Sequence, residues 1–140
     1  MSPEVGAYIL DSFALLAYLE DEAGAEQVEA RLIQAEKGEA KVLLSLINYG
    51  ECLYIVERER GLAQAQWTVG LVDRLPVQVV EVDRSLVLAA AHIKARYPIA
   101  YADAFAVALA QQIDGTLLTG DPEFRRVQGL IPIEWLPQRR

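Results

Sequence analysis

Two carboxylates come directly after apolar runs that are typical of buried strands. Asp11 follows the run YIL, and Asp121 follows TLLTG near the end of the chain. In an open α/β sheet, ligand-binding groups collect at the carboxyl ends of the strands. Both residues also suit a plainer role, since Asp caps helices well and Pro122 is favoured at a first helical position. Each carboxylate is therefore either a helix cap or a ligand.

Two further carboxylates lie within apolar segments of predicted helices. Asp103 is the only charged residue between Arg96 and Asp114, so its helix is predicted to be buried on nearly every side. A buried, unpaired carboxylate costs on the order of several kcal/mol, whereas a place in the first helical turn recovers only about 0.3–1 kcal/mol. Glu51, in INYGECLYI, shares a face with apolar residues. The alternative for Glu51 is a boundary position hydrogen-bonded to Asn48.

If these four carboxylates converge, they offer only hard oxygen donors. Such a set suits Mg²⁺ or Mn²⁺ and not zinc, and without a cation it repels itself. Sites of this kind activate a water and neutralise charge in phosphoryl chemistry. His92, the only histidine, lies in AAAHIKAR on a predicted helix, where we expect a structural or solvent-exposed role. The pattern favours a metal-dependent phosphoryl site over a histidine-based hydrolase.

Strands and helices alternate along the chain and must position these residues. The predicted strands cover 7–10, 41–45, 77–82, 115–119 and 131–136. The predicted helices cover 12–20, 23–36, 46–60, 62–74, 84–96, 100–113 and 122–127, with Gly61 as a helix C-cap. Strands separated by helices pair in parallel through right-handed crossovers. We therefore predict an α/β fold with a mostly parallel five-stranded sheet between two layers of helices, in one domain over residues 1–140.

Composition narrows the class of protein. The chain is 53% hydrophobic and 24% charged, which indicates a globular core. Its net charge of −7 lacks the basic footprint of proteins that bind nucleic acid mainly through phosphate neutralisation. The single cysteine, Cys52, excludes a disulfide framework, and the acidic N-terminal segment is wrong for a signal peptide or a membrane span. We expect a cytoplasmic protein that is not inserted in a membrane.

Three segments carry a resemblance to a known family: ILDSFALLAYL, SLINYGECL and YADAFAVALAQQIDGTLLTGDPEF. In this order and spacing the chain resembles the PIN-domain nucleases, and within them the VapC-type toxins of toxin–antitoxin pairs. The resemblance covers essentially the whole chain, and the last segment is the most specific. It implies a three-layer α/β/α sandwich and a Mg²⁺- or Mn²⁺-dependent endoribonuclease that leaves a 5′-phosphate and a 3′-hydroxyl.

The resemblance also implies roles for individual residues. The catalytic and metal-binding quartet is Asp11, Glu51, Asp103 and Asp121. Two polar side chains are expected to support it, Ser12 and Thr119. Basic residues near these segments are candidates for RNA binding: Arg125, Arg126, Lys94 and Arg96. The implied partners are an RNA substrate, a cognate antitoxin protein and a second copy of the chain in a homodimer.

Two alternatives stay open on the sequence. A PIN-like fold without catalysis would act as an RNA- or protein-binding module. A receiver-like signalling domain also places aspartates at strand ends and binds Mg²⁺, but it needs adjacent acidic residues after the first strand and a Lys after the last. The chain has only Asp11 at the first position, and IPIEWLPQRR contains no Lys.

Overall fold

The computed structural model describes residues 5–137 of the chain. The strands are β1 (Gly6–Leu10), β2 (Ala40–Ser45), β3 (Gln78–Val80), β4 (Thr116–Thr119) and β5 (Ile133–Trp135). The helices are α1 (Ser12–Leu19), α2 (Ala25–Glu36), α3 (Leu46–Arg60), α4 (Leu62–Val72), α5 (Arg84–Arg96), α6 (Tyr101–Ile113) and the 3₁₀ helix η1 (Pro122–Val127). Every predicted strand and helix is present, which confirms the predicted alternation.

The five strands form one parallel sheet in the order β3-β2-β1-β4-β5, with β1 in the middle. In the register of the sheet, Leu10 pairs with Leu44 on one side and with Leu118 on the other. The residues that follow these three leucines are Asp11, Ser45 and Thr119. Polar residues from three neighbouring strand ends therefore lie side by side at the carboxyl edge of the sheet.

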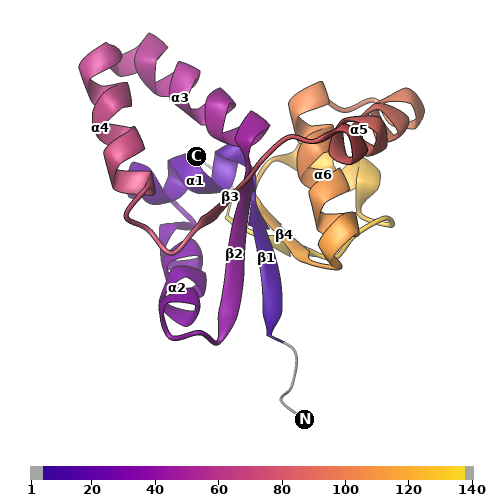
Figure 1. The fold of residues 1–140 in the computed structure, drawn as a ribbon, viewed down its shortest axis with the longest axis horizontal. Helices are drawn as coiled ribbons and strands as arrows, with labels where there is room; N and C mark the ends of the chain where they lie inside the picture. Colours follow the sequence, from indigo (N-terminus) through magenta and orange to yellow (C-terminus); the bar gives the residue numbers. More distant parts are fainter. Residues whose placement is uncertain (1–4, 138–140) are drawn as a thin grey trace.

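Helices cover both faces of the sheet, as the alternation of the strand side chains requires. Ile9 packs with α5, α6 and η1 on one face, whereas the next residue, Leu10, packs with α1 to α4 on the other. Leu43 and Leu117 share the side of Ile9. Figure 1 shows the two helical layers, with α5 and α6 to the right of the strands and α1 to α4 to the left. The predicted α/β/α sandwich is confirmed.

Several predicted boundaries were too generous, most clearly in the two edge strands. The strand predicted over 77–82 spans only Gln78–Val80, and the one over 131–136 spans only Ile133–Trp135. Each edge strand pairs with a single neighbour, β3 with Leu43–Ser45 of β2 and β5 with Leu117–Thr119 of β4, and it ends where this pairing ends. The helix predicted from residue 23 begins at Ala25, after Gly24 in a left-handed conformation.

The helix over 62–74 ends at Val72, whereas α3 begins and ends where the sequence predicted. Gly61, at a φ of 93°, ends α3 and donates its backbone N–H to the Glu57 carbonyl, which confirms the predicted C-cap. Across residues 5–137, the helices are all too short or too polar to cross a membrane.

Candidate metal centre

The four predicted acidic residues come from four segments that meet at the carboxyl edge of the sheet. Asp11 directly follows β1, and Asp121 comes two residues after β4. Glu51 lies in the second turn of α3, and Asp103 lies in the first turn of α6. These two helices pack against each other beside the strand ends (Figure 1). The Asn48 side-chain amide of α3 donates to the Ala102 carbonyl of α6 at 3.1 Å, which holds the helices together there.

Asp11 serves as a helix cap and as a member of the site through different oxygens. Its Oδ1 accepts from the Ala14 N–H at 2.8 Å, and its Oδ2 accepts from the Thr119 hydroxyl at 2.5 Å. The side chain is only 2% exposed. Burial, together with the nearby carboxylates of Asp121 and Glu51, raises its pKa from 3.8 to about 7, although these two hydrogen bonds oppose the rise.

Asp103 is the least compensated carboxylate of the site. It is 7% exposed, and in the described part of the chain no ion pair includes it. Burial raises its pKa from 3.8 to about 8, and the next largest cause is the negative charge of Asp11. The first-turn position on α6 does not offset these effects. The carboxylate thus lies where a cation would stabilise it strongly.

Glu123 joins the site, and the sequence interpretation did not include it. Asp103, Asp121 and Glu123 each offer one carboxylate oxygen, and these three oxygens lie within 4.8 Å of one another. Asp121 also caps η1, since its Oδ1 accepts from the Glu123 N–H at 2.9 Å. The signal in the sequence was an acidic residue two positions after a predicted ligand, in the first turn of a helix that the ligand caps. We call Asp11, Glu51, Asp103, Asp121 and Glu123 the edge cluster.

Both predicted polar supports contact carboxylates or backbone of the edge cluster. The Ser12 hydroxyl donates to Glu51 Oε1 at 2.6 Å, which links α1 to α3. The Thr119 hydroxyl donates to Asp11 and accepts from the Asp121 N–H at 3.0 Å. Glu51 therefore accepts from Ser12, whereas the side-chain NH₂ of Asn48 donates to the Ala102 carbonyl instead. Hydroxyl groups orient the buried carboxylates without neutralising them.

The predicted basic residues lie in two places. Three of them are exposed, on the last turn of α5 or on η1: Lys94, Arg96 and Arg125. Arg126 is also exposed; its guanidinium donates to the Pro98 carbonyl at 2.6 Å and lies 3.5 Å from Glu123 Oε1. It is therefore connected to the edge cluster through Glu123. His92 is exposed on α5 and belongs to none of the metal-ligand groups found in residues 5–137.

The donor set of the edge cluster fits a hard divalent cation. All five side chains are carboxylates, which match the oxygen preference of Mg²⁺ and Mn²⁺. The raised pKa values of Asp11 and Asp103 show that mutual repulsion and burial oppose full ionisation of the cluster. A divalent cation would remove both costs at once. The arrangement is thus chemically suited to metal-assisted hydrolysis of a phosphate ester.

The fold is similar to that of several solved toxin–antitoxin proteins. A chain of VapBC2 from Rickettsia felis, solved with a promoter DNA fragment, superposes with a TM-score of 0.73 at 15% identity, covering 93% of this chain and 98% of that one. DNA-bound VapBC from Salmonella typhimurium superposes with a TM-score of 0.71 at 18% identity, covering 94% of this chain and 98% of that one. VapC20 from Mycobacterium tuberculosis, a toxin that cleaves the sarcin–ricin loop, superposes with a TM-score of 0.67 at 17% identity, covering 87% of this chain and 95% of that one. No curated protein sequence matches the chain.

The strand order separates this fold from the receiver-like alternative. Receiver domains have the order 2-1-3-4-5, whereas this sheet has the order 3-2-1-4-5. The receiver-like interpretation is therefore wrong. The sequence profile of the PIN domain matches residues 8–130, which include the whole edge cluster. The chain belongs to the PIN-domain family.

Proposed function

We propose that this protein is a Mg²⁺- or Mn²⁺-dependent endoribonuclease and the toxin of a toxin–antitoxin pair. The observation that carries the proposal is the convergence of Asp103, Asp121 and Glu123, with carboxylate oxygens within 4.8 Å of one another, beside the buried Asp11. Asp11 and Asp103 are buried and have no basic partner among the described residues, and such carboxylates destabilise a folded protein unless a cation binds beside them. Membership of the PIN-domain family supports the same chemistry.

The residues of the edge cluster have separable tasks in this proposal. Asp11, Asp103 and Asp121 would hold the cation, with Glu51 and Glu123 completing the site. A divalent cation bound there activates a water and neutralises charge on the phosphate and on the leaving oxygen. Ser12 fixes the Glu51 carboxylate, and Thr119 fixes Asp11. Because these hydroxyls hold the acids in place before the substrate binds, little reorganisation is needed during attack on the RNA phosphodiester, which leaves a 5′-phosphate and a 3′-hydroxyl.

The proposed partners follow from the same family and from the surface. We propose that RNA phosphates approach the site along the side of η1, where Arg125 and Arg126 are exposed. We also propose that a cognate antitoxin and a second copy of the chain cover apolar surface, for which the half-exposed side chains of Tyr54 and Trp67 are candidates. Residues 1–140 would form one cytoplasmic PIN domain.

The proposal is tested by exchanging Asp103 for Asn. The purified wild-type protein should cut an end-labelled single-stranded RNA in Mn²⁺ or Mg²⁺, leave 5′-phosphates, and lose activity in EDTA. Asp103→Asn should lose this activity and keep its far-UV circular dichroism. Asp114→Asn makes the same change at the exposed end of the same helix, in a left-handed conformation that Asn adopts readily, and should keep the wild-type rate.

Two outcomes contradict the proposal. If Asp103→Asn cuts RNA at the wild-type rate, the edge cluster is not the catalytic site. If the wild-type protein binds RNA or a partner but cuts no RNA in either metal, the chain is the inactive binding module of the alternative interpretation.

A further inference from the structure

Gly120 lies in the turn between Thr119, which supports the edge cluster, and Asp121, which belongs to it. Thr119, before it, donates its hydroxyl to Asp11 and accepts the Asp121 N–H. Asp121, after it, caps η1 through the Glu123 N–H. The position of this turn, residues 119–121, therefore sets how Asp121 and Glu123 lie relative to Asp11.

The ring of Phe13 lies directly against this turn. A Cβ atom added to Gly120 would lie 2.6 Å from Phe13 Cζ and closer still to Cε1. Real Cβ atoms do not approach other atoms so closely, so the ring occupies the space that any side chain at position 120 would need. The glycine is required here for a close approach, and its backbone conformation is not the left-handed one that favours glycine.

Phe13 belongs to the same turn of α1 that builds the site. It stands between Ser12, which binds Glu51, and Ala14, whose N–H binds Asp11. One helical turn thus orients two carboxylates by hydrogen bonds and places an aromatic ring against the turn that carries a third, Asp121. Of these three contacts, two are hydrogen bonds, and the contact of the Phe13 ring is made by packing.

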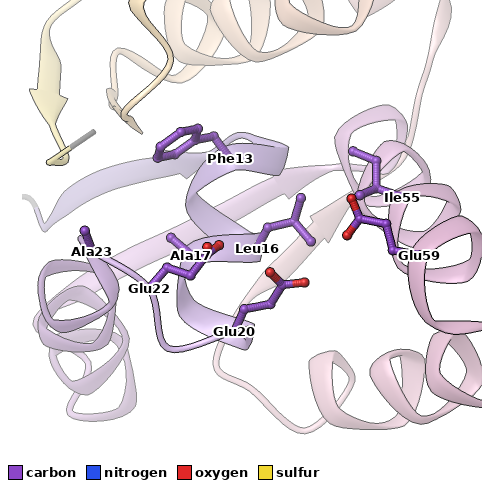
Figure 2. A pocket seen from close by; sticks show the side chains of 8 residues that line it. All are labelled: Phe13, Leu16, Ala17, Glu20, Glu22, Ala23, Ile55 and Glu59. Atoms are coloured by element: carbon purple, nitrogen blue, oxygen red, sulfur yellow. The ribbon is translucent and has the colours of Figure 1, made fainter. Parts of the chain in front are cut away.

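Phe13 also lines a small pocket between α1 and α3. The pocket has a volume of about 90 Å³, and Leu16, Ala17 and Ile55 form its apolar wall. Figure 2 shows the Phe13 ring at the upper end of this pocket, with Leu16 below it and the carboxylate of Glu20 at the lower end. Since Phe13 is only partly buried and lines this pocket, we expect a smaller side chain at position 13 to leave the protein folded.

We propose that Phe13 is a positioning residue for the metal centre: its ring packs on Gly120 and holds the turn 119–121 so that Asp121 reaches the other carboxylates. This inference rests on the proposed function for its effect on catalysis, but the packing itself is independent of metal. Without the ring, the turn keeps its hydrogen bonds to Thr119 but loses its lateral support. Asp121 and Glu123 then sample positions outside the cluster.

The test compares Phe13→Ala with Leu16→Ala. Both variants remove a partly buried apolar side chain of α1 from the same pocket, but the three atoms nearest to a Cβ at position 120 all belong to Phe13. In the metal-free protein, hydrogen exchange at the Asp121 amide should become at least about tenfold faster in Phe13→Ala and stay within about twofold in Leu16→Ala, because local opening controls exchange. With Mn²⁺, Phe13→Ala should weaken the metal Kd about tenfold and lower kcat, with the KM for RNA unchanged.

A second pair of variants tests the contact directly. Gly120→Ala should also weaken the Mn²⁺ Kd, because the added methyl group would overlap the ring and force the ring or the turn to move. In the double variant with Phe13→Ala, the methyl group meets no ring and should cause no further loss, so the two effects should be non-additive.

The positioning role is overturned if Phe13→Ala matches Leu16→Ala in amide exchange, or if the two changes at positions 13 and 120 are additive. Failure of the proposed function would look different. In that case the wild-type protein would bind no Mn²⁺ and cut no RNA, while the metal-free exchange comparison would still decide the role of Phe13.

Discussion

Two groups of carboxylates lie at opposite ends of the same helices. The edge cluster lies at the N-terminal ends of α1, α3 and α6, beside the strand ends. The second group, which we call the pocket cluster, lies at the C-terminal ends of α1 and α3 and consists of Glu20, Glu22 and Glu59 around the pocket of Figure 2. Both groups gather at least three carboxylates, yet their surroundings differ in burial and in neighbouring charge.

Glu20 has a basic partner that the two buried carboxylates of the edge cluster, Asp11 and Asp103, lack among the described residues. Burial raises the pKa of Glu20, but the guanidinium of Arg60, 3.7 Å away, opposes the rise. Glu59 is exposed to solvent. By contrast, Asp11 and Asp103 are almost fully buried, and the groups that shift their pKa values by charge are other carboxylates. The number of acidic residues therefore does not identify a metal site; burial without a basic partner does.

The largest expected difference between the clusters is in catalysis. Asp11→Asn keeps an oxygen for the Ala14 N–H but removes a charge from the edge cluster, and it should lower the rate of RNA cleavage by on the order of 10³-fold. Glu59→Gln removes one charge from the pocket cluster and should leave the rate within about twofold. Initial rates with a labelled RNA at saturating Mn²⁺ measure both. Equal losses of rate in the two variants would contradict the proposal that only the edge cluster is catalytic.

The pH dependence of stability should separate the clusters next. Asp11 and Asp103 have folded pKa values of about 7 and 8, above the ordinary value of 3.8. Between pH 3.8 and these folded pKa values, the native state therefore holds more protons than the unfolded state. The stability they contribute is complete below pH 4 and is lost as the pH rises through 7 and 8. In EDTA, the free energy of unfolding should fall by on the order of a few kcal/mol between pH 5 and pH 8.5.

Variants at the two clusters check the source of this pH dependence. Asp103→Asn should be more stable than the wild-type protein at pH 8.5 in EDTA and should show a flatter profile, because it removes a buried charge. Glu59→Gln should keep the wild-type profile. Urea unfolding at each pH gives the free energies, and a wild-type protein that becomes more stable with rising pH would contradict the assignment.

Metal binding should stabilise the protein through the edge cluster only. A cation bound by the folded state alone adds about 2.7 kcal/mol at a free concentration of one hundred times its Kd. Mn²⁺ should therefore raise the Tm of the wild-type protein and of Glu20→Gln by similar amounts, and it should leave Asp103→Asn unchanged. Thermal unfolding with and without Mn²⁺, with Ca²⁺-free buffer as reference, measures the shift. A Tm shift that Glu20→Gln abolishes would place the metal in the pocket cluster.

The smallest expected effects come from the groups that orient the carboxylates. Ser12→Ala removes the hydroxyl that donates to Glu51, so it should raise the barrier to cleavage by about 1 kcal/mol, a several-fold loss of rate. Arg60→Ala removes the partner of Glu20 from a partly exposed pair and should change stability by at most about 0.5 kcal/mol, with no change in rate. Cleavage rates and urea unfolding of both variants test this order. A larger rate loss in Arg60→Ala than in Ser12→Ala would reverse it.

Much of the fold could be predicted because it depends on local pattern. The β-branched and apolar runs, the turn residues between them and the C-cap Gly61 were sufficient for the order of strands and helices. The ends of β3 and β5 could not be predicted, because each strand ends where its pairing with a neighbour distant in the sequence ends. The start of α2 depended on the left-handed conformation of Gly24, which no periodicity reveals.

The candidate site was partly readable for the same reason. Asp103 could be identified because a single charged residue on an apolar helix is energetically costly unless it binds a partner. Glu123 was not, because an acidic residue in the first turn of a helix is ordinary until Asp103 and Asp121 lie within 4.8 Å of its oxygens. The role of Phe13 could not be predicted either, since an aromatic residue on an amphipathic helix is normally part of the core. Its contact with Gly120 joins positions more than a hundred residues apart.

The sequence by itself determined which residues could hold a cation and on which kinds of element they lie, because helix and strand patterns depend on neighbours within a few positions. Only the tertiary structure decided that Asp11 acts as a cap with one oxygen and accepts the Thr119 hydroxyl with the other, and that Arg60 accompanies Glu20 and no basic group accompanies Asp103 in the described residues. Burial and charge pairing are sums over distant parts of the chain, and the strand order 3-2-1-4-5 is what brings those parts together.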